Sequence, residues 1–260
     1  MSLMSFNDVL IGRRRVLGVS CATLLQSVGA SGAEDYEFDG MPDSSEPDFG
    51  PHFMERGNSE PSHDDRLLAE ILLRDKIPSV GRPIDIARAF LSDEFPERFR
   101  GRWPTPGPWN PVISTFLDGV GFPESPDLIP WCAAFVGWCL HRGNKPTTGL
   151  ASAQSFLSPN SPLRQTDTPR EGDLAVFVLR IADSDEETTN GHVGFVSQVP
   201  NQAGVGLRLL AGNQSVRANG RLFHSVISDV PYNFVGRPFV MEYKHTNTRV
   251  YLKLKGWVSV

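Results

Sequence analysis

Between residues 62 and 157, apolar residues recur at the three- and four-residue spacing of amphipathic helices. The predicted helices begin at Ser62, cover Pro83–Phe95, begin at Asn110, and cover Trp131–His141 and Ala151–Leu157. Ser62 with Asp65 has the form of a capping box, and Asn110 before Pro111 has the form of a helix cap with proline in the first turn. The first predicted helix carries an apolar stripe along one side, formed by Leu67, Leu68, Ile71 and Leu72.

After Pro169 the apolar pattern changes to that of strands. The predicted strands are Leu174–Leu179, His192–Val199, Leu207–Ala211, Gly236–Tyr243 and Arg249–Lys255. The last of them alternates polar and apolar residues, which predicts a half-exposed strand. The acidic stretch Asp183–Glu187 is expected to be a solvated loop. Helices followed by a mostly antiparallel sheet define an α+β fold, with residues 62–260 forming one domain.

Composition limits the classes of function. The chain has 260 residues, 40% of them hydrophobic, and a formal charge of −5, which allows one sizeable core. Lys and Arg do not cluster beyond the N-terminus, so no basic patch supports a nucleic-acid partner. Three cysteines are too few for a disulfide framework. We therefore expect a globular domain whose chemistry is concentrated in a few residues.

The N-terminus has the pattern of an export signal. Arg13–Arg15 precede an apolar run of about 13 residues, too short for a membrane span of about 20. Ser31–Ala33 offers a cleavage site, and the paired arginines resemble a twin-arginine signal. We expect residues 1–33 to be a signal peptide, with Cys21 discarded in it rather than carrying a membrane anchor. A basic N-terminus on a cytosolic protein is the alternative.

Residues 34–61 are acidic and rich in Pro, Gly and Ser, with almost no aliphatic residues. Such a segment buries too little apolar surface to offset the cost of ordering, so we expect a disordered linker. The predicted organisation is therefore a signal peptide, a linker and a catalytic domain over residues 62–260, in an exported protein that is periplasmic or secreted.

A thiol lies at the start of the helix predicted over Trp131–His141. Cys132 then falls in the first turn, where unpaired N–H groups and the helix dipole favour a thiolate. Cys139 is about two turns further on, roughly 10 Å along the axis, so the two cannot form a disulfide within one helix. Cys132 is the candidate nucleophile and Cys139 a buried spectator. The alternative is that Cys132 is a small core residue.

A cysteine nucleophile needs a base, and the base needs an orienting group. Among six histidines, His192 follows Gly191 and opens a predicted strand, which favours a position at a sheet edge; a satisfied surface histidine is the alternative. Asn213 follows the next strand, where its amide oxygen could accept the other imidazole N–H. A Gly-Asn turn explains Asn213 equally well on local grounds. The order of the three residues is more specific than any one of them.

Four segments, in this order, resemble the CHAP family: Pro130–Leu140, Pro169–Phe177, Gly191–Phe195 and Ala211–Gln214. Members are cysteine, histidine-dependent amidohydrolases or peptidases of the papain-like superfamily, related to NlpC-type cell-wall hydrolases. The resemblance covers about residues 84–239 and implies that Cys132 is the nucleophile, His192 the base and Asn213 the orienting residue. The loop Asp183–Glu187 and the segment from Glu242 onward depart from the family pattern.

The resemblance also implies the substrate. We expect hydrolysis of amide or peptide bonds in peptidoglycan, with stem peptides as partners and no metal or organic cofactor. Trp131 and Trp109 are expected to line the substrate cleft, with core packing as the alternative. Two other functions stay open. One is a papain-like protease or amidase with a non-wall substrate; the other is a catalytically silent wall-binding module on the same fold.

Overall fold

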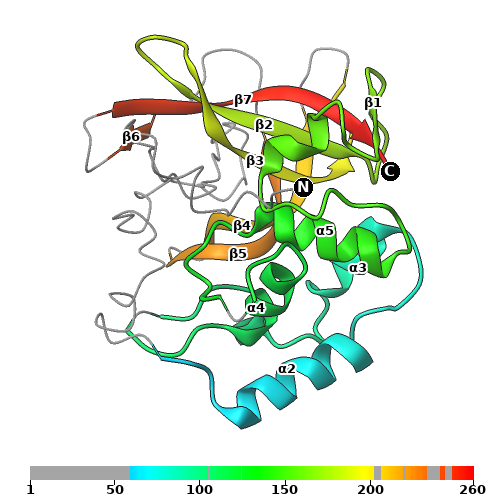
Figure 1. Ribbon diagram of the computed structural model, residues 1–260, viewed down its shortest axis with the longest axis vertical. Helices are drawn as coiled ribbons and strands as arrows, with labels where there is room; N and C mark the ends of the chain where they lie inside the picture. Colours follow the sequence, from blue (N-terminus) through cyan, green and yellow to red (C-terminus); the bar gives the residue numbers. More distant parts are fainter. Residues whose placement is uncertain are drawn as a thin grey trace, which may run out of the picture.

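Most of the helices gather toward one end of the molecule and most of the strands toward the other, as Figure 1 shows for this computed structural model. The structure describes residues 59–260 except 105, 124, 202–205, 219–220, 233–240 and 244–247. The predicted signal peptide and most of the predicted linker lie outside the described residues. In the described part the helices precede a single antiparallel sheet, so the predicted α+β class is confirmed.

The helical half agrees with the capping signals of the sequence. Its elements are α2 (His63–Asp75), α3 (Pro83–Ala89), the 3₁₀ helix η2 (Glu97–Phe99), α4 (Pro111–Asp118), α5 (Cys132–Arg142) and the 3₁₀ helix η3 (Ala153–Leu157). The Ser62 hydroxyl accepts from the Asp65 N–H at 3.1 Å, and the Asn110 side chain accepts from the N–H of Val112 at 2.9 Å. The helix predicted to reach Phe95 ends instead at Ala89.

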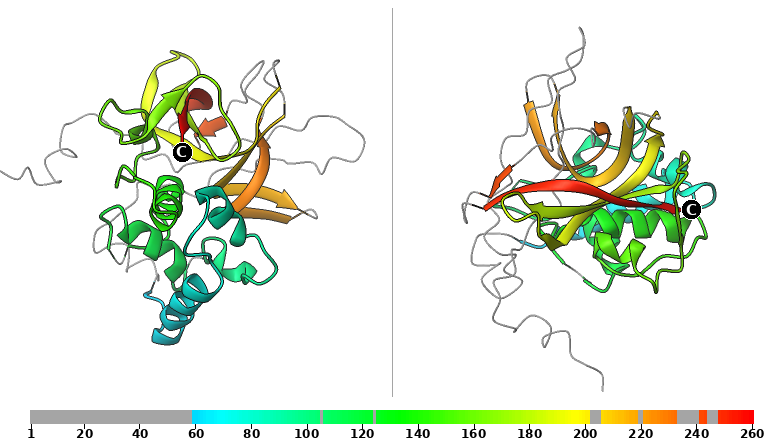
Figure 2. Two further views of the ribbon diagram at one scale, coloured as in Figure 1. Left: turned by 90° about the vertical axis from the view of Figure 1, so that its right-hand side faces the viewer. Right: turned by 90° about the horizontal axis from the view of Figure 1, so that it is seen from above.

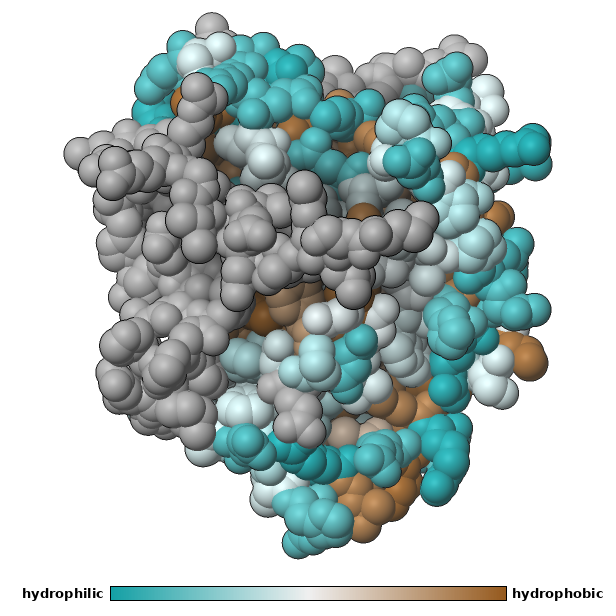
Figure 3. Space-filling model, in the orientation of Figure 1, coloured by the Kyte–Doolittle hydropathy of each residue, from teal (hydrophilic) through white to brown (hydrophobic). Residues whose placement is uncertain are grey.

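The apolar stripe predicted on α2 is only partly buried. Leu72 and Leu73 face the core, whereas Leu67 and Leu68 are 47% and 38% exposed. Apolar surface accordingly gathers at the lower end of the molecule in Figure 3, where α2 lies. No helix in the described part of the chain is long and apolar enough to cross a membrane.

Within the described residues the sheet has seven strands. They are β1 (Arg164–Thr166), β2 (Leu174–Ile181), β3 (Glu187–Gln198), β4 (Leu207–Ala218), β5 (Arg221–Tyr232), β6 (Met241–Tyr243) and β7 (Thr248–Ser259). Their order is β1-β7-β2-β3-β4-β5, and β6 pairs with β7. The sequence pattern did not predict β1 or β5, and most of the strand expected over Gly236–Tyr243 lies outside the described residues.

Strand β7 lies in the segment from Glu242 onward, which departs from the family pattern. β7 pairs with β2 over most of its length, from Leu174 opposite Val258 to Ile181 opposite Val250. On its other side it pairs with β1. The segment from Glu242 onward therefore supplies an interior strand of the sheet.

Two apolar clusters cover the two faces of the sheet. The larger one lies between the helices and the sheet, where Phe90, Phe116 and Phe135 meet edge to face with centroids 5.5–5.6 Å apart. Such pairs contribute about 0.5–1.5 kcal/mol each beyond the burial of their surface. The smaller cluster includes Phe177 and Tyr232. The views in Figure 2 show the helices on one side of the sheet.

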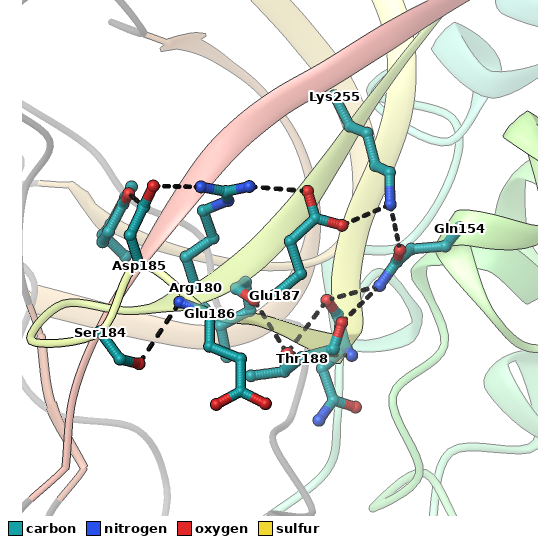
Figure 4. Close-up of polar contacts among 11 residues, drawn as sticks. Gln154, Arg180, Ser184, Asp185, Glu186, Glu187, Thr188 and Lys255 are labelled. Carbon is teal, nitrogen blue, oxygen red and sulfur yellow. Dashed lines mark hydrogen bonds and ion pairs between the residues drawn. The ribbon is translucent and has the colours of Figure 1, made fainter.

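The acidic stretch Asp183–Glu187 is exposed, as expected, but the charges of Asp185 and Glu187 are paired in the β2–β3 hairpin (Figure 4). Arg180 binds Asp185 and also Glu187, the latter at 2.9 Å. Lys255 of β7 donates to Glu187 at 2.7 Å, and hydrogen bonds from Lys255 and Arg180 hold the pKa of the Glu187 carboxyl below its ordinary value. The charges thus tie the hairpin to the neighbouring strand β7.

Candidate functional site

Cys132 is the first residue of α5, as the sequence predicts. Its backbone N–H lies in the first turn of the helix, where the helix dipole favours a negative charge. The residue is fully buried. Cys132 can act as a nucleophile only as a reduced thiol that ionises to the thiolate.

Cys139 is buried two turns along the same helix. Burial raises the pKa of its thiol well above the ordinary value. A thiol held in its protonated form is a poor nucleophile. Its predicted role as a buried spectator agrees with this environment.

The two tryptophans expected to line a cleft lie in the protein interior. Trp131 is fully buried, stacks on Phe116 with centroids 6.1 Å apart, and donates from Nε1 to Ser225 Oγ at 2.9 Å. Trp109 is 6% exposed. This burial corresponds to the core-packing alternative, and neither indole presents an open surface to a substrate here.

The start of α5 lies directly against strand β4. A Cβ atom at Gly212 would be 2.2 Å from Cζ3 of Trp131 and 3.0 Å from Cβ of Phe135. Any side chain at position 212 would thus occupy the space of the indole ring. The glycine in the Ala211–Gln214 motif lets the residue before Cys132 reach the backbone beside Asn213.

His192 lies inside a strand rather than at its start, because β3 begins at Glu187. The residue is fully buried, opposite Phe177 in the β2–β3 register, and its ring stacks on Tyr232 with centroids 6.1 Å apart. Burial in these surroundings lowers the pKa of the imidazole to about 3. Neither ring nitrogen has a hydrogen-bond partner among the described residues. The ring is therefore neutral near pH 7.

Asn213 lies in β4, 6% exposed, with a φ of 59°. Its Oδ1 accepts a hydrogen bond from Ser225 Oγ at 2.5 Å. A Cβ at Gly194 of β3 would be 2.7 Å from Cβ of Ala211. β3 and β4 are antiparallel, so the residues before Gly194 lie beside the residues after Ala211. His192 and Asn213 therefore lie toward the same end of this strand pair.

The three candidate residues are thus brought together to different degrees. Trp131 and Ser225 link the start of α5 to Asn213. His192 lies in the adjacent strand, but its ring is grouped with Phe177 and Tyr232, whereas the neighbouring Val193 packs with the helical core. The structure therefore contains the elements of a Cys-His-Asn arrangement without a hydrogen bond from the imidazole to the other two residues.

Sequence reasoning missed two buried polar groups near this region. One is Ser225, whose contacts are to residues far away in the sequence. The other is Asp127, whose Oδ2 accepts from the backbone N–H of Trp103 at 3.0 Å and of Asn110 at 2.9 Å. Burial raises the pKa of the Asp127 carboxyl to about 6, despite these hydrogen bonds. The Asp127 carboxylate thereby joins the loop before α4 to the segment before α5.

Metal ligation has no candidate in the described part of the chain, where no three His, Cys, Asp or Glu residues form a group that could hold an ion.

Comparison with protein families identifies the segment that carries these residues. Residues 124–213 match the model of the CHAP domain, and the match includes Cys132, His192 and Asn213. For this segment, the match confirms the resemblance expected from the sequence. CHAP domains are typically cysteine amidases or peptidases that act on peptidoglycan. No curated protein and no solved structure matched the chain.

Proposed function

We propose that this protein is an exported cysteine hydrolase that cleaves amide or peptide bonds in peptidoglycan. Cys132 is the nucleophile, His192 the general base and acid, and Asn213 the residue that orients the imidazole. The observation that carries the proposal is the CHAP-domain match, which spans all three residues and has Cys132 as the first residue of a helix.

The proposed reaction proceeds in two steps. The Cys132 thiolate attacks the amide carbonyl, and the backbone N–H groups at the start of α5 stabilise the negative charge on its oxygen. As the C–N bond breaks, His192 gives the leaving amine the proton that it took from the thiol. Water, deprotonated by the same imidazole, then attacks the thioester and releases the acid and the Cys132 thiol.

The imidazole of His192 is neutral near pH 7, as a base must be, but burial lowers its pKa to about 3 and so makes it a weak proton acceptor in this environment. An adjacent Cys132 thiolate would raise the pKa of the imidazole, since an opposite charge favours the protonated form. The proposal therefore requires the reduced thiol and the imidazole to approach one another in the active enzyme. The amide oxygen of Asn213 would accept the second imidazole N–H.

Export forms part of the proposal. A signal peptide over residues 1–33 and a linker over residues 34–61 would place the catalytic domain in the periplasm or outside the cell, where peptidoglycan lies. Removal of the signal would leave Cys132 and Cys139 as the cysteines of the mature chain.

The test compares the reduced protein, its Cys132→Ala variant and its Cys139→Ala variant on purified peptidoglycan, with soluble products identified by mass spectrometry. The proposal expects muropeptides from the unsubstituted protein and from Cys139→Ala, and none from Cys132→Ala. The product masses name the bond that is cut. Product release by Cys132→Ala at the unsubstituted rate would contradict the assignment of the nucleophile.

A catalytically silent wall-binding module is the second candidate. It is favoured by the full burial of Cys132 and by the imidazole that is turned toward Tyr232. This candidate expects the reduced protein to sediment with peptidoglycan without releasing muropeptides, and Cys132 to resist alkylation until the protein unfolds. Rapid alkylation without release of wall fragments would instead indicate a hydrolase with a non-wall substrate.

A further inference from the structure

A chain of two hydrogen bonds crosses the protein interior beside the proposed nucleophile. The indole Nε1 of Trp131 donates to Ser225 Oγ at 2.9 Å, and Ser225 Oγ donates to Asn213 Oδ1 at 2.5 Å. The three residues are 0%, 7% and 6% exposed, so water does not compete strongly for these contacts. The chain joins α5, β5 and β4.

The chemistry of the donor groups fixes the direction of both hydrogen bonds. An indole N–H only donates, so the hydroxyl oxygen of Ser225 accepts from Trp131 and its hydrogen is available to the next residue. That hydrogen requires an acceptor, which selects the oxygen of the Asn213 amide rather than its NH₂ group. The amide of Asn213 is thus held in one orientation.

The backbone at both ends of the second bond has an uncommon conformation. Asn213 and Ser225 have φ values of 59° and 54°, in the left-handed region that residues other than glycine rarely adopt. The β4–β5 pairing shifts register at this point, between Ala211 and Gln214. Such conformations persist where surrounding contacts determine them, and they concentrate at functional sites.

Ser225 is also fixed from the other side. Its carbonyl oxygen accepts from the Arg102 N–H at 3.0 Å, and Gly101 forms a β-bridge with Val226. The loop before α4 therefore holds the backbone of Ser225 while its hydroxyl reaches into the interior. The hydroxyl has little freedom to turn away from Asn213.

We propose that Ser225 is a positioning residue of the hydrolase: its hydroxyl holds the Asn213 amide in the orientation that can accept the imidazole N–H when His192 approaches Cys132, and it ties that amide to the residue preceding Cys132. This inference rests on the proposed function. Its consequence is that removal of the hydroxyl should weaken the orientation of the imidazole by Asn213 and so disfavour the Cys132 thiolate.

The test uses the full chain under reducing conditions, with Ser225→Ala and Ser225→Gly. Glycine adopts a positive φ without strain, so Ser225→Gly removes the hydroxyl while it eases the backbone. Ser114→Ala is the matched control, because Ser114 is also 7% exposed. Its hydroxyl donates to the Ser125 carbonyl at 2.7 Å and takes no part in the two hydrogen bonds that join Trp131, Ser225 and Asn213. Circular dichroism confirms that each variant is folded.

The main readout is the rate at which iodoacetamide alkylates Cys132 as a function of pH, followed by mass spectrometry of the peptide that contains it. We expect both Ser225 variants to move the midpoint of this profile upward by about one pH unit, toward the ordinary thiol value of about 8.5. Muropeptide release should fall about 10-fold or more. Ser114→Ala should leave the pH midpoint unchanged, whatever its effect on stability.

The outcomes separate the two proposals. An unchanged midpoint in Ser225→Gly overturns the positioning role, whether or not peptidoglycan is the substrate. Fast alkylation without muropeptide release overturns the proposed substrate, and the Ser225 comparison still decides the positioning role. If Cys132 of the folded, unsubstituted protein alkylates no faster than in the unfolded chain, neither the nucleophile nor the positioning role stands.

Discussion

The indole ring of Trp131 lies on the backbone of Gly212, at a distance that leaves no room for a Cβ atom. This contact fixes how closely the start of α5 approaches β4. It also explains why a glycine precedes Asn213: a larger residue would push away the helix end that carries Cys132.

The substitution Gly212→Ala is therefore expected to lower the free energy of unfolding by about 1–3 kcal/mol, the usual cost of overpacking a filled core. It should also reduce muropeptide release, because the start of α5 has to shift. Urea denaturation and the peptidoglycan assay measure the two effects. Gly119→Ala is the control, since a Cβ there would be 3.4 Å from the Phe116 carbonyl oxygen, an ordinary contact. Equal stability of the two variants would contradict the prediction.

The two cysteines of α5 should differ in reactivity. Burial holds the pKa of the Cys139 thiol well above its ordinary value, so the thiol stays protonated at neutral pH. We expect a thiol reagent to label Cys139 only at the rate of global unfolding, and to label reduced Cys132 much faster. Mass spectrometry of the labelled peptides distinguishes the sites. Labelling of Cys139 ahead of Cys132 in the native protein would reverse our assignment.

His192 and Asp127 should have opposite effects on stability as the pH changes. The folded pKa of His192, about 3, lies below its ordinary value of 6.5, so the unfolded chain binds the extra proton between these values and stability rises with pH. The folded pKa of Asp127, about 6, lies above its ordinary value of 3.8, so stability falls as the pH rises through that window. Between pH 4 and 6 the two contributions largely cancel.

Single substitutions should reveal each contribution. We expect Asp127→Asn to give a free energy of unfolding that increases from pH 4 to 6, by up to about 1.4 kcal/mol per pH unit. His192→Gln should give the opposite slope relative to the unsubstituted protein. Urea titrations at several pH values measure both. Parallel pH profiles for the two variants would show that one of the two groups is not buried as described.

Gln154 should contribute more to the stability of the β2–β3 hairpin than the charged residues around it. Its Nε2 donates to the backbone carbonyls of Thr188 at 2.8 Å and Asn190 at 3.2 Å (Figure 4). Loss of both bonds in Gln154→Ala is expected to cost about 1–2 kcal/mol. Glu187→Gln should have little effect, because its ion pairs with Arg180 and Lys255 are exposed to solvent and screened by salt. Thermal unfolding compares the two, and a larger loss for Glu187→Gln would refute the ranking.

Local sequence signals predicted those helices and strands whose formation depends on residues close to one another in the sequence. Asn110 before Pro111 predicts the start of α4, because a cap forms within three residues. Cys132 at the start of α5 follows from the apolar run after Pro130. The approximate positions of β2 and β4 follow from continuous apolar stretches.

Features that depend on contacts between residues far apart in the sequence could not be predicted from local patterns. β7 is interior because it pairs with β1 and β2, which no local pattern records. β3 begins at Glu187, earlier than predicted, because Lys255 and Arg180 stabilise a polar stretch as strand. Ser225 is an ordinary serine in the sequence, and its contact to Trp131 spans 94 positions. The burial of Trp131 likewise depends on Gly212.

The interior position of β7 has a consequence for synthesis. Every strand that β7 touches is made earlier, so β1 and β2 leave the ribosome before the strand that separates them in the finished sheet. Until residue 259 emerges, β2 presents an unpaired edge that invites pairing with other chains. The sheet can therefore be completed only after translation of β7, and until then the edge of β2 is open to pairing with another chain.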